Sequence, residues 1–317
     1  MRDVSAWMGA FPALSAPLCY AKLPRTGLGN MLLVWARAAV FAELNQMPLL
    51  TSGFAALRLG PFLRFEREKR IYVTDFLPPS PVQFSRAELL LRLGRVVREA
   101  PIERIPVSEM HPFSLYLYHA PPDFFLSFAE HRDFVRERLL AMLTPERRRE
   151  LSQAEAPVIG VHVRRGDFGK ISPDHDLARS LGPTPLSHFI RIIRLVREFV
   201  QKDLEVTVFS DGHDDELRAL LDMPNVRRAK SRSAIVDLIL LSRSQIVIPS
   251  AWSTFSLWSG FLSDAPLLLH PMEHEHLRAI RPAGLSARFY EGCVPERVVD
   301  FPALLQRNLR CLKEATE

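Results

Sequence analysis

Residues 158–167 read Val-Ile-Gly-Val-His-Val-Arg-Arg-Gly-Asp, an apolar run that ends in two adjacent arginines. A continuous apolar run of this length predicts a strand that is buried on both faces of a parallel sheet. Ligands of open parallel sheets bind beyond the carboxyl ends of the strands, which is where Arg164 and Arg165 would lie. A guanidinium can donate to two phosphate oxygens at once and keeps its charge when it is partly desolvated. The segment therefore predicts an α/β sheet with an anion site at its edge.

Two interpretations of this segment are open at this point. In the functional one, Arg164 and Arg165 bind phosphate, Asp167 braces one of them, and His162 marks the end of the strand. In the structural one, an Arg–Asp pair simply forms on a solvated loop.

Downstream of the arginines, apolar runs alternate with helical periods. Apolar residues recur at 186, 189, 190, 193, 196 and 200, which predicts a helix over 186–200. Further helices are expected over 214–221, 234–242 and 250–262, and strands over 205–209, 246–248 and 267–269. Ser210 or Asp211 is expected to cap the helix over 214–221, and Ser233 the helix over 234–242. Such alternation predicts a parallel sheet with helices on both faces.

The upstream half opens on a strand over 17–23, a glycine turn, and a helix from the N-cap Asn30 to about residue 45. With a second strand over 47–51, this is a βαβ beginning. A helical stretch is expected near 86–98 within the irregular, proline-punctuated segment 54–122, a charged helix over 129–143, and a polar connection over 145–156. We therefore expect an α/β protein of two facing Rossmann-like domains with parallel sheets. They span residues 1–150 and 151–290, and a helical segment follows over 291–317.

Composition excludes few classes of protein. The 317 residues are 47% hydrophobic and 24% charged, as in globular proteins, and carry a net charge of +5. A positive balance fits an anionic ligand, nucleic acid or an acidic membrane surface, and the scattered basic residues disfavour nucleic acid. Three cysteines without a C-x-x-C spacing predict a reducing compartment. The N-terminus makes a poor secretion signal, so we expect a cytoplasmic protein, unless a partner or a basic face holds it at a membrane.

Two further segments could bind phosphate. Residues 250–256, Ser-Ala-Trp-Ser-Thr-Phe-Ser, follow a predicted strand and begin a helix, and a helix N-terminus with hydroxyl groups is an anion site. Ordinary N-capping is the alternative. Residues 27–30, Gly-Leu-Gly-Asn, form a glycine turn, but Leu32 replaces the third glycine of a dinucleotide fingerprint.

Two acidic or histidine-containing runs raise the alternative of a metal site. Residues 211–216 read Asp-Gly-His-Asp-Asp-Glu, and residues 270–276 include three histidines and two glutamates. Acidic residues in a first helical turn also favour the helix dipole, and the second run lacks the His-Glu-x-x-His spacing of zinc sites. We therefore expect capped or solvated helix starts and no metal.

Taken in order, these segments resemble the bacterial α-1,2-fucosyltransferase family and the wider fucosyltransferase superfamily with an H-x-R-R-x-D signature. The family's G-G-L-G-N-Q-M-F-Q-Y-A resembles residues 26–36, its H-V-R-R-G-D-Y resembles 162–168, and its F-S-D-D resembles 209–212. Its D-L-x-L-M-S and S-S-F-S-W-W resemble 237–242 and 253–258, so the resemblance spans about residues 20–265. The chain departs from these motifs at Thr26, Met31, Val34, Gly212 and Leu257.

The resemblance implies a GT-B architecture and an inverting, metal-independent transfer of L-fucose from GDP-fucose to a glycan hydroxyl, with an α-1,2 linkage favoured. No cofactor is required in this scheme. Arginines aimed at the departing diphosphate stabilise the transition state more than the ground state. The residues implied in catalysis are Arg164, Arg165 and Asp167, with Asp174, His175 and Asp176 as candidates for a base.

The resemblance also implies which residues bind the donor. Arg164 and Arg165 would hold its diphosphate, and Asp167 would fix their loop. The remaining positions are His162 and Asp237 at the guanosine end, Ser253 and Thr254 at phosphate, Asp211 lining the nucleotide pocket, and Gly29 and Asn30 facing them from the other domain.

Two rival functions are carried forward. One is a GT-B glycosyltransferase with another nucleotide-sugar donor, and the other is a non-catalytic protein that binds nucleotide or glycan. The expected partners are a nucleotide sugar and a glycan acceptor, not nucleic acid.

Overall fold

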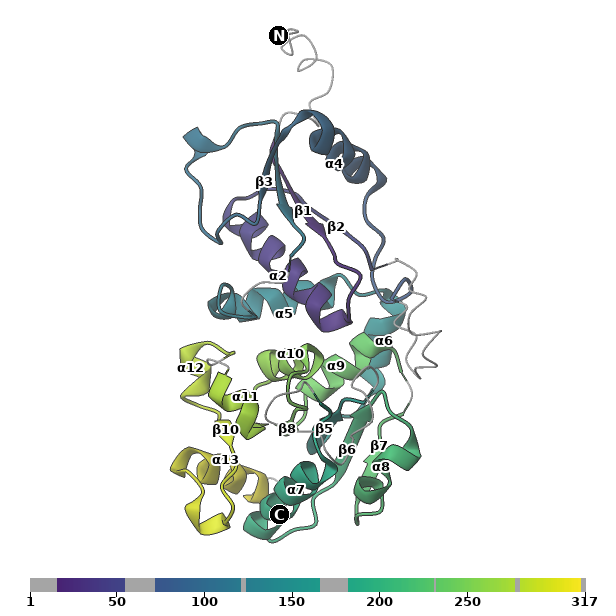
Figure 1. Cartoon of the computed structure of the whole chain (residues 1–317), viewed down its shortest axis with the longest axis vertical. Coiled ribbons are helices and arrows are strands. Elements are labelled where there is room, and N and C mark those ends of the chain that lie inside the picture. Colours follow the sequence, from purple (N-terminus) through teal and green to yellow (C-terminus); the bar gives the residue numbers. More distant parts are fainter. Residues whose placement is uncertain are drawn as a thin grey trace. The chain divides into compact units, whose positions relative to one another are not determined.

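The computed structural model describes residues 16–54, 72–120, 124–165, 182–230, 232–276 and 280–314. The chain divides into two units, each with its own parallel sheet (Figure 1). Among the described residues, unit 1 ends at Thr144 and unit 2 begins at Pro145. None of the described helices is both long and apolar enough to cross a bilayer.

Unit 1 is built on a four-stranded sheet in the order β2-β1-β4-β3. Its strands are all parallel and comprise β1 (Leu18–Lys22), β2 (Leu49–Ser52), β3 (Arg95–Arg98) and β4 (Ser114–Tyr118). Successive side chains of a strand point to opposite faces. Leu18 and Tyr20 therefore pack in one core cluster with Leu90 of helix α4 (Pro81–Leu93). On the other face, the thiol of Cys19 donates to the Ala38 carbonyl of helix α2 (Leu28–Leu44), so the two helices cover opposite faces of the sheet.

Helix α2 is buried along most of its length. Thirteen of its 17 residues are buried, and it contacts β1, β4 and helix α5 (Arg132–Ala141). A helix that is apolar all round needs partners on more than one side, and these three elements supply them.

Unit 2 is built on a six-stranded parallel sheet in the order β10-β9-β8-β5-β6-β7. The strands are β5 (Ile159–Val163), β6 (Val206–Ser210), β7 (Val226–Arg228), β8 (Ile246–Ile248), β9 (Leu267–Leu269) and β10 (Glu291–Cys293). The chain runs from β5 outward to β7, returns to β8, and then runs outward to β10. The strand order therefore changes direction between β5 and β8, which is the topological switch point where doubly wound sheets bind ligands.

Helices cover both faces of this second sheet. Ile159 and Val161 pack in a core cluster with residues of α7 (Leu186–Val200), α8 (Asp214–Leu221) and α13 (Ala303–Glu314). On the opposite face, a Cβ atom on Gly160 would lie 2.1 Å from the Ser244 hydroxyl, so β5 needs glycine where α9 (Ala234–Ser242) ends against it. The remaining helices are α6 (Pro145–Gln153), α10 (Thr254–Leu262), α11 (Pro271–His276) and α12 (Ala283–Ser286), with 3-10 turns at Val107–Glu109, Ala129–His131 and Val298–Asp300.

Both units have a parallel sheet, which confirms the prediction of an α/β protein with parallel sheets. A GT-B fold is made of two such units. The helices predicted over 186–200, 214–221 and 234–242 have these bounds in the structure, as do the strands predicted over 246–248 and 267–269.

Several predicted elements differ from the structure. Helix α2 begins at Leu28 with Gly27 as its N-cap, so Asn30 lies inside the helix and does not cap it. The helix expected over 86–98 is α4 followed by β3. The chain changes direction at Gly94, where a Cβ atom would lie 2.7 Å from the Phe113 carbonyl oxygen.

Other differences concern segments expected to be irregular or differently bounded. The charged helix begins with a 3-10 turn before α5, and the polar stretch 145–156 forms helix α6. Strand β10 pairs with β9, and α13 places Leu305 and Leu309 in the core of unit 2. The sheet and core of unit 2 therefore extend past residue 290, where a separate helical segment was predicted.

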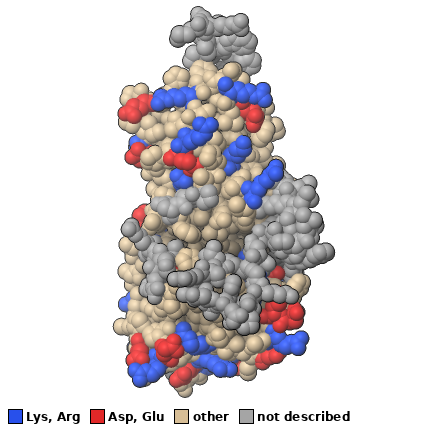
Figure 2. Space-filling view, viewed as in Figure 1, with Lys and Arg blue, Asp and Glu red and all other residues tan. Residues whose placement is uncertain are grey.

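Charged side chains are spread over both units. On the face shown in Figure 2, basic and acidic side chains are interspersed and neither sign forms a continuous patch. Many of the charges are paired, as in the bridges Arg197–Asp203 and Arg227–Glu205, at 2.6 and 2.7 Å.

Candidate active site

Three strands of unit 2 deliver polar residues to one edge of the sheet. Arg164 and Arg165 directly follow β5, and Asp211 directly follows β6. Ser250 is the second residue after the end of β8. Because the carboxyl ends of parallel strands meet at the same edge, these side chains converge at the switch point between β5 and β8.

Asp211 binds both arginines of the motif. Its carboxylate forms an ion pair with the Arg164 guanidinium and accepts the backbone N–H of Arg165 at 2.7 Å. The Asp211 side chain is 8% exposed and that of Arg164 is 18% exposed. A buried carboxylate therefore holds the arginine segment, the role predicted for Asp167. Asp167 itself lies outside the described residues.

Arg165 is more deeply buried than Arg164. One of its terminal nitrogens donates to the Thr184 carbonyl at 3.1 Å, and its side chain packs against Gly212. A Cβ atom at position 212 would lie 2.7 Å from the Cγ atom of Arg165. Gly212 is one of the positions at which this chain departs from the motifs that it resembles. The glycine leaves the space that the Arg165 side chain occupies.

The loop after β8 is tied to the end of β5. The Ser250 hydroxyl accepts the backbone N–H of Arg164 at 2.8 Å and donates to the His162 carbonyl at 2.9 Å. Helix α10 then begins, with Ser253 as N-cap accepting the N–H of Ser256 at 3.4 Å. Its first turn, which begins at Thr254, presents backbone N–H groups at the edge that carries the arginines. A helix N-terminus beside two guanidinium groups is suited to an anion such as a diphosphate.

His162 is neutral and buried in the structure. Its ring lies 2.6 Å from the Ser256 hydroxyl and stacks on Phe255 with 4.7 Å between ring centroids. Burial, helped by the charge of Arg164, lowers the pKa of His162 to about 3. The imidazole therefore contributes no positive charge at neutral pH. Its observed contacts join β5 to α10, and contact with a guanosine stays a prediction.

The acidic run 211–216 is used for capping and ion pairing. Helix α8 is capped by His213, whose backbone N–H donates to Glu216 at 2.7 Å, and not by Ser210 or Asp211 as expected. Asp214 forms an ion pair with Arg228. The Ser210 hydroxyl instead donates to the Val163 carbonyl at 2.6 Å and so joins β6 to β5.

Histidines from two elements meet on the neighbouring part of unit 2. The rings of His188 and His270 lie 4.5 Å apart, and burial lowers the pKa of His188 to about 3. Within the described part of the chain, no three His, Cys, Asp or Glu side chains gather closely enough to hold a metal ion. Metal independence stays a prediction.

The other predicted site residues are placed as follows. Asp237 is half-buried in the first turn of α9, and its backbone N–H donates to the Ser233 carbonyl at 3.0 Å. Gly29 is buried and Asn30 half-buried in the first turn of α2, in unit 1. The candidate bases Asp174, His175 and Asp176 lie outside the described residues.

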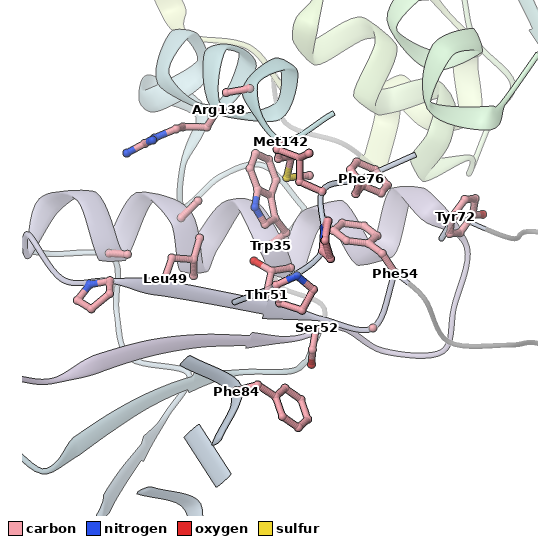
Figure 3. Close-up of a pocket in the computed structure, with 18 of the residues that line it drawn as sticks. Trp35, Leu49, Thr51, Ser52, Phe54, Tyr72, Phe76, Phe84, Arg138 and Met142 are labelled. Carbon is pink, nitrogen blue, oxygen red and sulfur yellow. The ribbon is translucent and has the colours of Figure 1, made fainter. Parts of the chain in front are cut away.

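Unit 1 carries a pocket that the sequence did not predict in detail. Its volume is about 760 Å³, and α2, β2, residues 72–84 and the α5 region line it (Figure 3). Trp35, Phe76 and Met142 contribute apolar walls, and Phe84 is 43% exposed at its edge. The charged residues in the lining, Glu43 and Arg138, are 3.3 Å apart and pair with each other. The pocket thus offers mainly apolar surface to a ligand.

The sequence matches the model of a protein family described as glycosyl transferase family 11 over residues 104–266, just over half of the chain. The chain belongs to glycosyl transferase family 11. The match includes the arginine segment, Asp211, Asp237 and the loop that begins α10. Family 11 enzymes are glycosyltransferases, so the site assembled at the switch point belongs to a glycosyltransferase.

This family 11 chain also resembles solved structures at low identity. NodZ, an α-1,6-fucosyltransferase soaked with GDP-fucose, matches with 16% identity and a TM-score of 0.45, over 78% of this chain and 93% of that one. NodZ from Bradyrhizobium matches with 16% identity and a TM-score of 0.43, over 78% and 94% of the two chains. POFUT1 in complex with GDP-fucose matches with 13% identity and a TM-score of 0.47, over 81% and 98%. No curated protein matches the sequence.

Proposed function

We propose that this glycosyltransferase transfers L-fucose from GDP-fucose to a glycan hydroxyl, with inversion and without a metal ion, and that an α-1,2 linkage is favoured. The observation that carries the proposal is the pair Arg164–Arg165, held by Asp211 and Thr184 at the switch point of unit 2. The order of the sequence motifs supports the fucose donor. The chain resembles NodZ soaked with GDP-fucose and POFUT1 in complex with GDP-fucose.

The proposed mechanism follows from where charge develops. Breaking the bond between the fucose C1 atom and the donor phosphate places negative charge on the departing diphosphate and positive charge on the sugar. Guanidinium groups that are already oriented stabilise this state without reorganisation during the reaction. Arg164 and Arg165 supply the positive charge, because His162 is neutral. The first turn of α10, with Ser253 and Thr254, adds backbone N–H groups.

The acceptor hydroxyl attacks the opposite face of the sugar, and a base removes its proton. Asp174, His175 and Asp176 remain the proposed candidates for that base. His162 and Asp237 are proposed to contact the guanosine, and Gly29 and Asn30 of unit 1 are proposed to bind the donor. Asp167 is proposed to brace the arginine segment together with Asp211.

A donor panel tests the proposal. Thermal unfolding is measured with GDP, GDP-fucose, GDP-mannose, UDP, UDP-galactose and UDP-glucose, because a ligand at 100 times its Kd stabilises the folded state by about 2.7 kcal/mol. We expect GDP and GDP-fucose to raise the unfolding temperature. Stabilisation by UDP compounds alone would replace the donor with another nucleotide sugar. Binding of GDP-fucose without its hydrolysis or transfer to any acceptor would favour a non-catalytic nucleotide-binding protein.

The pocket of unit 1 is where we place part of the acceptor. Its aromatic and aliphatic walls suit an apolar face or an aglycone, since its charged lining residues pair with each other. The KM values for lactose and for an octyl galactoside test whether the pocket binds an apolar group of the acceptor. A lower KM for the octyl compound would support an apolar subsite, and equal KM values would contradict it.

Location in the cytoplasm, with peripheral association at the inner face of the membrane, is the last part of the proposal. The outward side of α4 supports it, because Val82, Leu89 and Leu93 are 68%, 38% and 81% exposed, and Arg92 is exposed on the same helix. Sedimentation with vesicles tests it. We expect binding to vesicles that contain anionic lipid and weaker binding after Leu93→Asp. If the wild type does not bind to these vesicles, the proposed membrane association is contradicted.

A further inference from the structure

The loop between β8 and α10 is held at successive residues by different elements of unit 2. Ser250 is bound to the end of β5, as described above. The Ala251 N–H donates to the Thr184 hydroxyl at 2.9 Å, and the Trp252 N–H donates to the Glu273 carboxyl at 3.1 Å. Because Thr184 also accepts from Arg165, the loop and the arginine segment share a support. Glu273 is the support of the loop that no motif of the sequence predicts.

Trp252 has an unusual backbone conformation. Its φ angle is +57°, in the left-handed region that large side chains seldom adopt. Such a conformation persists when surrounding contacts fix it, and it is typical of functional loops. The Trp252 N–H donates to the Glu273 carboxyl, which helps to fix this conformation. The next residue, Ser253, begins the helix whose N-terminus we propose for the donor diphosphate.

Glu273 is buried, and no described residue is seen to pair with its charge. Its side chain is wholly buried in α11, and its Oε2 atom has no hydrogen-bond partner among the described residues. Burial raises the pKa of Glu273 to about 8, and the bond from Trp252 opposes that rise. At neutral pH the group is therefore an uncharged carboxylic acid that accepts one N–H bond.

In the part of the chain that the structure describes, the ionisable groups near Glu273 do not neutralise its charge. The loop over 249–253 and helix α10 contain no ionisable side chain. His270 precedes Glu273 and touches His188, and burial lowers the pKa of both histidines. On β10, against which α11 packs, Glu291 is paired with Arg281 at 2.9 Å.

We propose that Glu273 is a positioning residue of the donor site, whose buried carboxyl holds the Trp252 N–H and thereby places the N-terminus of α10 for the diphosphate. Ionisation of this carboxyl puts an uncompensated negative charge behind a site for an anion and weakens donor binding. The inference rests on the proposed function only for the identity of that anion. The bond to Trp252 can be tested without it.

Hydrogen exchange of the peptide 249–256 tests the positioning role without a ligand. In Glu273→Ala the loop loses an acceptor, and we expect its amides to exchange at least tenfold faster than in the wild type. Glu273→Gln keeps a carbonyl acceptor and should restore slow exchange. Glu146→Gln, in which an exposed glutamate of α6 is changed, is the matched control and should behave as wild type. Unchanged exchange in Glu273→Ala would overturn the role, and if that variant does not fold, faster exchange in Glu273→Gln would do so.

GDP binding, measured by calorimetry between pH 6.5 and 9, tests the consequence for the donor. We expect the affinity of the wild type to fall about tenfold above pH 8, the change that one pKa unit of coupling gives. Glu273→Gln cannot ionise and should show a flatter profile, while Glu146→Gln should follow the wild type. Equal slopes in wild type and Glu273→Gln would overturn the inference. Failure of the wild type to bind GDP at any pH would instead overturn the proposed donor and leave the exchange test valid.

Stability gives a third, independent measurement. An unfolded glutamate has its usual pKa of 4.5, so between pH 4.5 and about 8 the folded state binds more protons at Glu273 than the unfolded state. The free energy of unfolding must then fall as the pH rises through this window. We expect the wild type to lose stability relative to Glu273→Gln from pH 4.5 to 8. A constant difference would show that Glu273 is ionised in the folded protein.

Discussion

The sheet edge of unit 2 and the pocket of unit 1 are built from opposite kinds of contact. At the sheet edge, Arg164, Arg165 and Asp211 bind one another or the backbone, and the loop at Ser250 joins the same network. In the pocket, the walls are mainly apolar, and the charges of Glu43 and Arg138 are paired. A network of buried charges responds as a unit, whereas apolar contacts add in small increments. Substitutions should therefore have large and distant effects in unit 2 and small, local effects in unit 1.

The largest effect is expected from the arginines. Arg164→Ala or Arg165→Ala removes a cation that stabilises the departing diphosphate, so kcat/KM should fall on the order of 10²-fold or more. Donor hydrolysis and transfer are both measured by release of GDP. Arg227→Ala, in which an exposed arginine of β7 is changed, is the control and should stay near wild type. Activity within a fewfold of wild type in both arginine variants would end their proposed role.

A smaller effect is expected from a substitution of Gly212, against which Arg165 packs. Gly212→Ala places a methyl group against the Arg165 side chain, so Arg165 must move. We expect a loss of about 1–3 kcal/mol in the free energy of unfolding and a drop of roughly tenfold in kcat. Gly284→Ala is the control, because a Cβ atom there meets nothing within 4 Å. If both alanine variants are equally active and stable, Arg165 is not fixed as described.

In unit 1 the expected effect is smaller still. Phe84→Ala removes a ring at the edge of the pocket, which should raise the KM for octyl galactoside about fivefold, since partial burial of a ring is worth on the order of 1 kcal/mol. The KM for GDP-fucose should not change. Leu93→Ala alters an exposed residue of the same helix that does not line the pocket, and it should leave both constants unchanged. A rise in the donor KM alone would contradict the placement of the acceptor.

No effect is expected from removal of divalent ions. With two guanidinium groups and a helix N-terminus at the diphosphate, transfer should proceed at its full rate in EDTA. The rate is compared with and without added Mg²⁺ and Mn²⁺. Loss of activity in EDTA, restored by either ion, would refute metal independence and return attention to the acidic segment 211–216.

The sequence predicted unit 2 better than unit 1 for a physical reason. Helix α7 has a strong 3.6-residue period, and β8 and β9 are short apolar runs between clear turn residues, so local pattern alone defines them. In unit 1, β4 reads Ser-Leu-Tyr-Leu-Tyr and is buried on both faces, but its sequence lies in a proline-punctuated segment that predicts irregular chain. Strand β10 has three residues and exists because it pairs with β9.

The same distinction applies to the site. The arginines could be found from the sequence because a motif and a strand end coincide there. Their partner Asp211 was found as a site residue, but its ion pair with Arg164 joins residues 47 positions apart and needs the fold. Glu273 could not be found, because one glutamate in a run of histidines and glutamates carries no signal of burial. Its bond to Trp252 depends on how α11 packs beside the loop.

The contact between Gly212 and Arg165 has a consequence for how this protein can evolve. The motif F-S-D-D, which residues 209–212 resemble, has an acidic residue at the position of Gly212. In this chain, any side chain there competes for the volume that the Arg165 side chain already occupies. A variant that acquires an acid there must repack the arginine in the same step or pass through a damaged intermediate. The two positions should therefore change together or not at all.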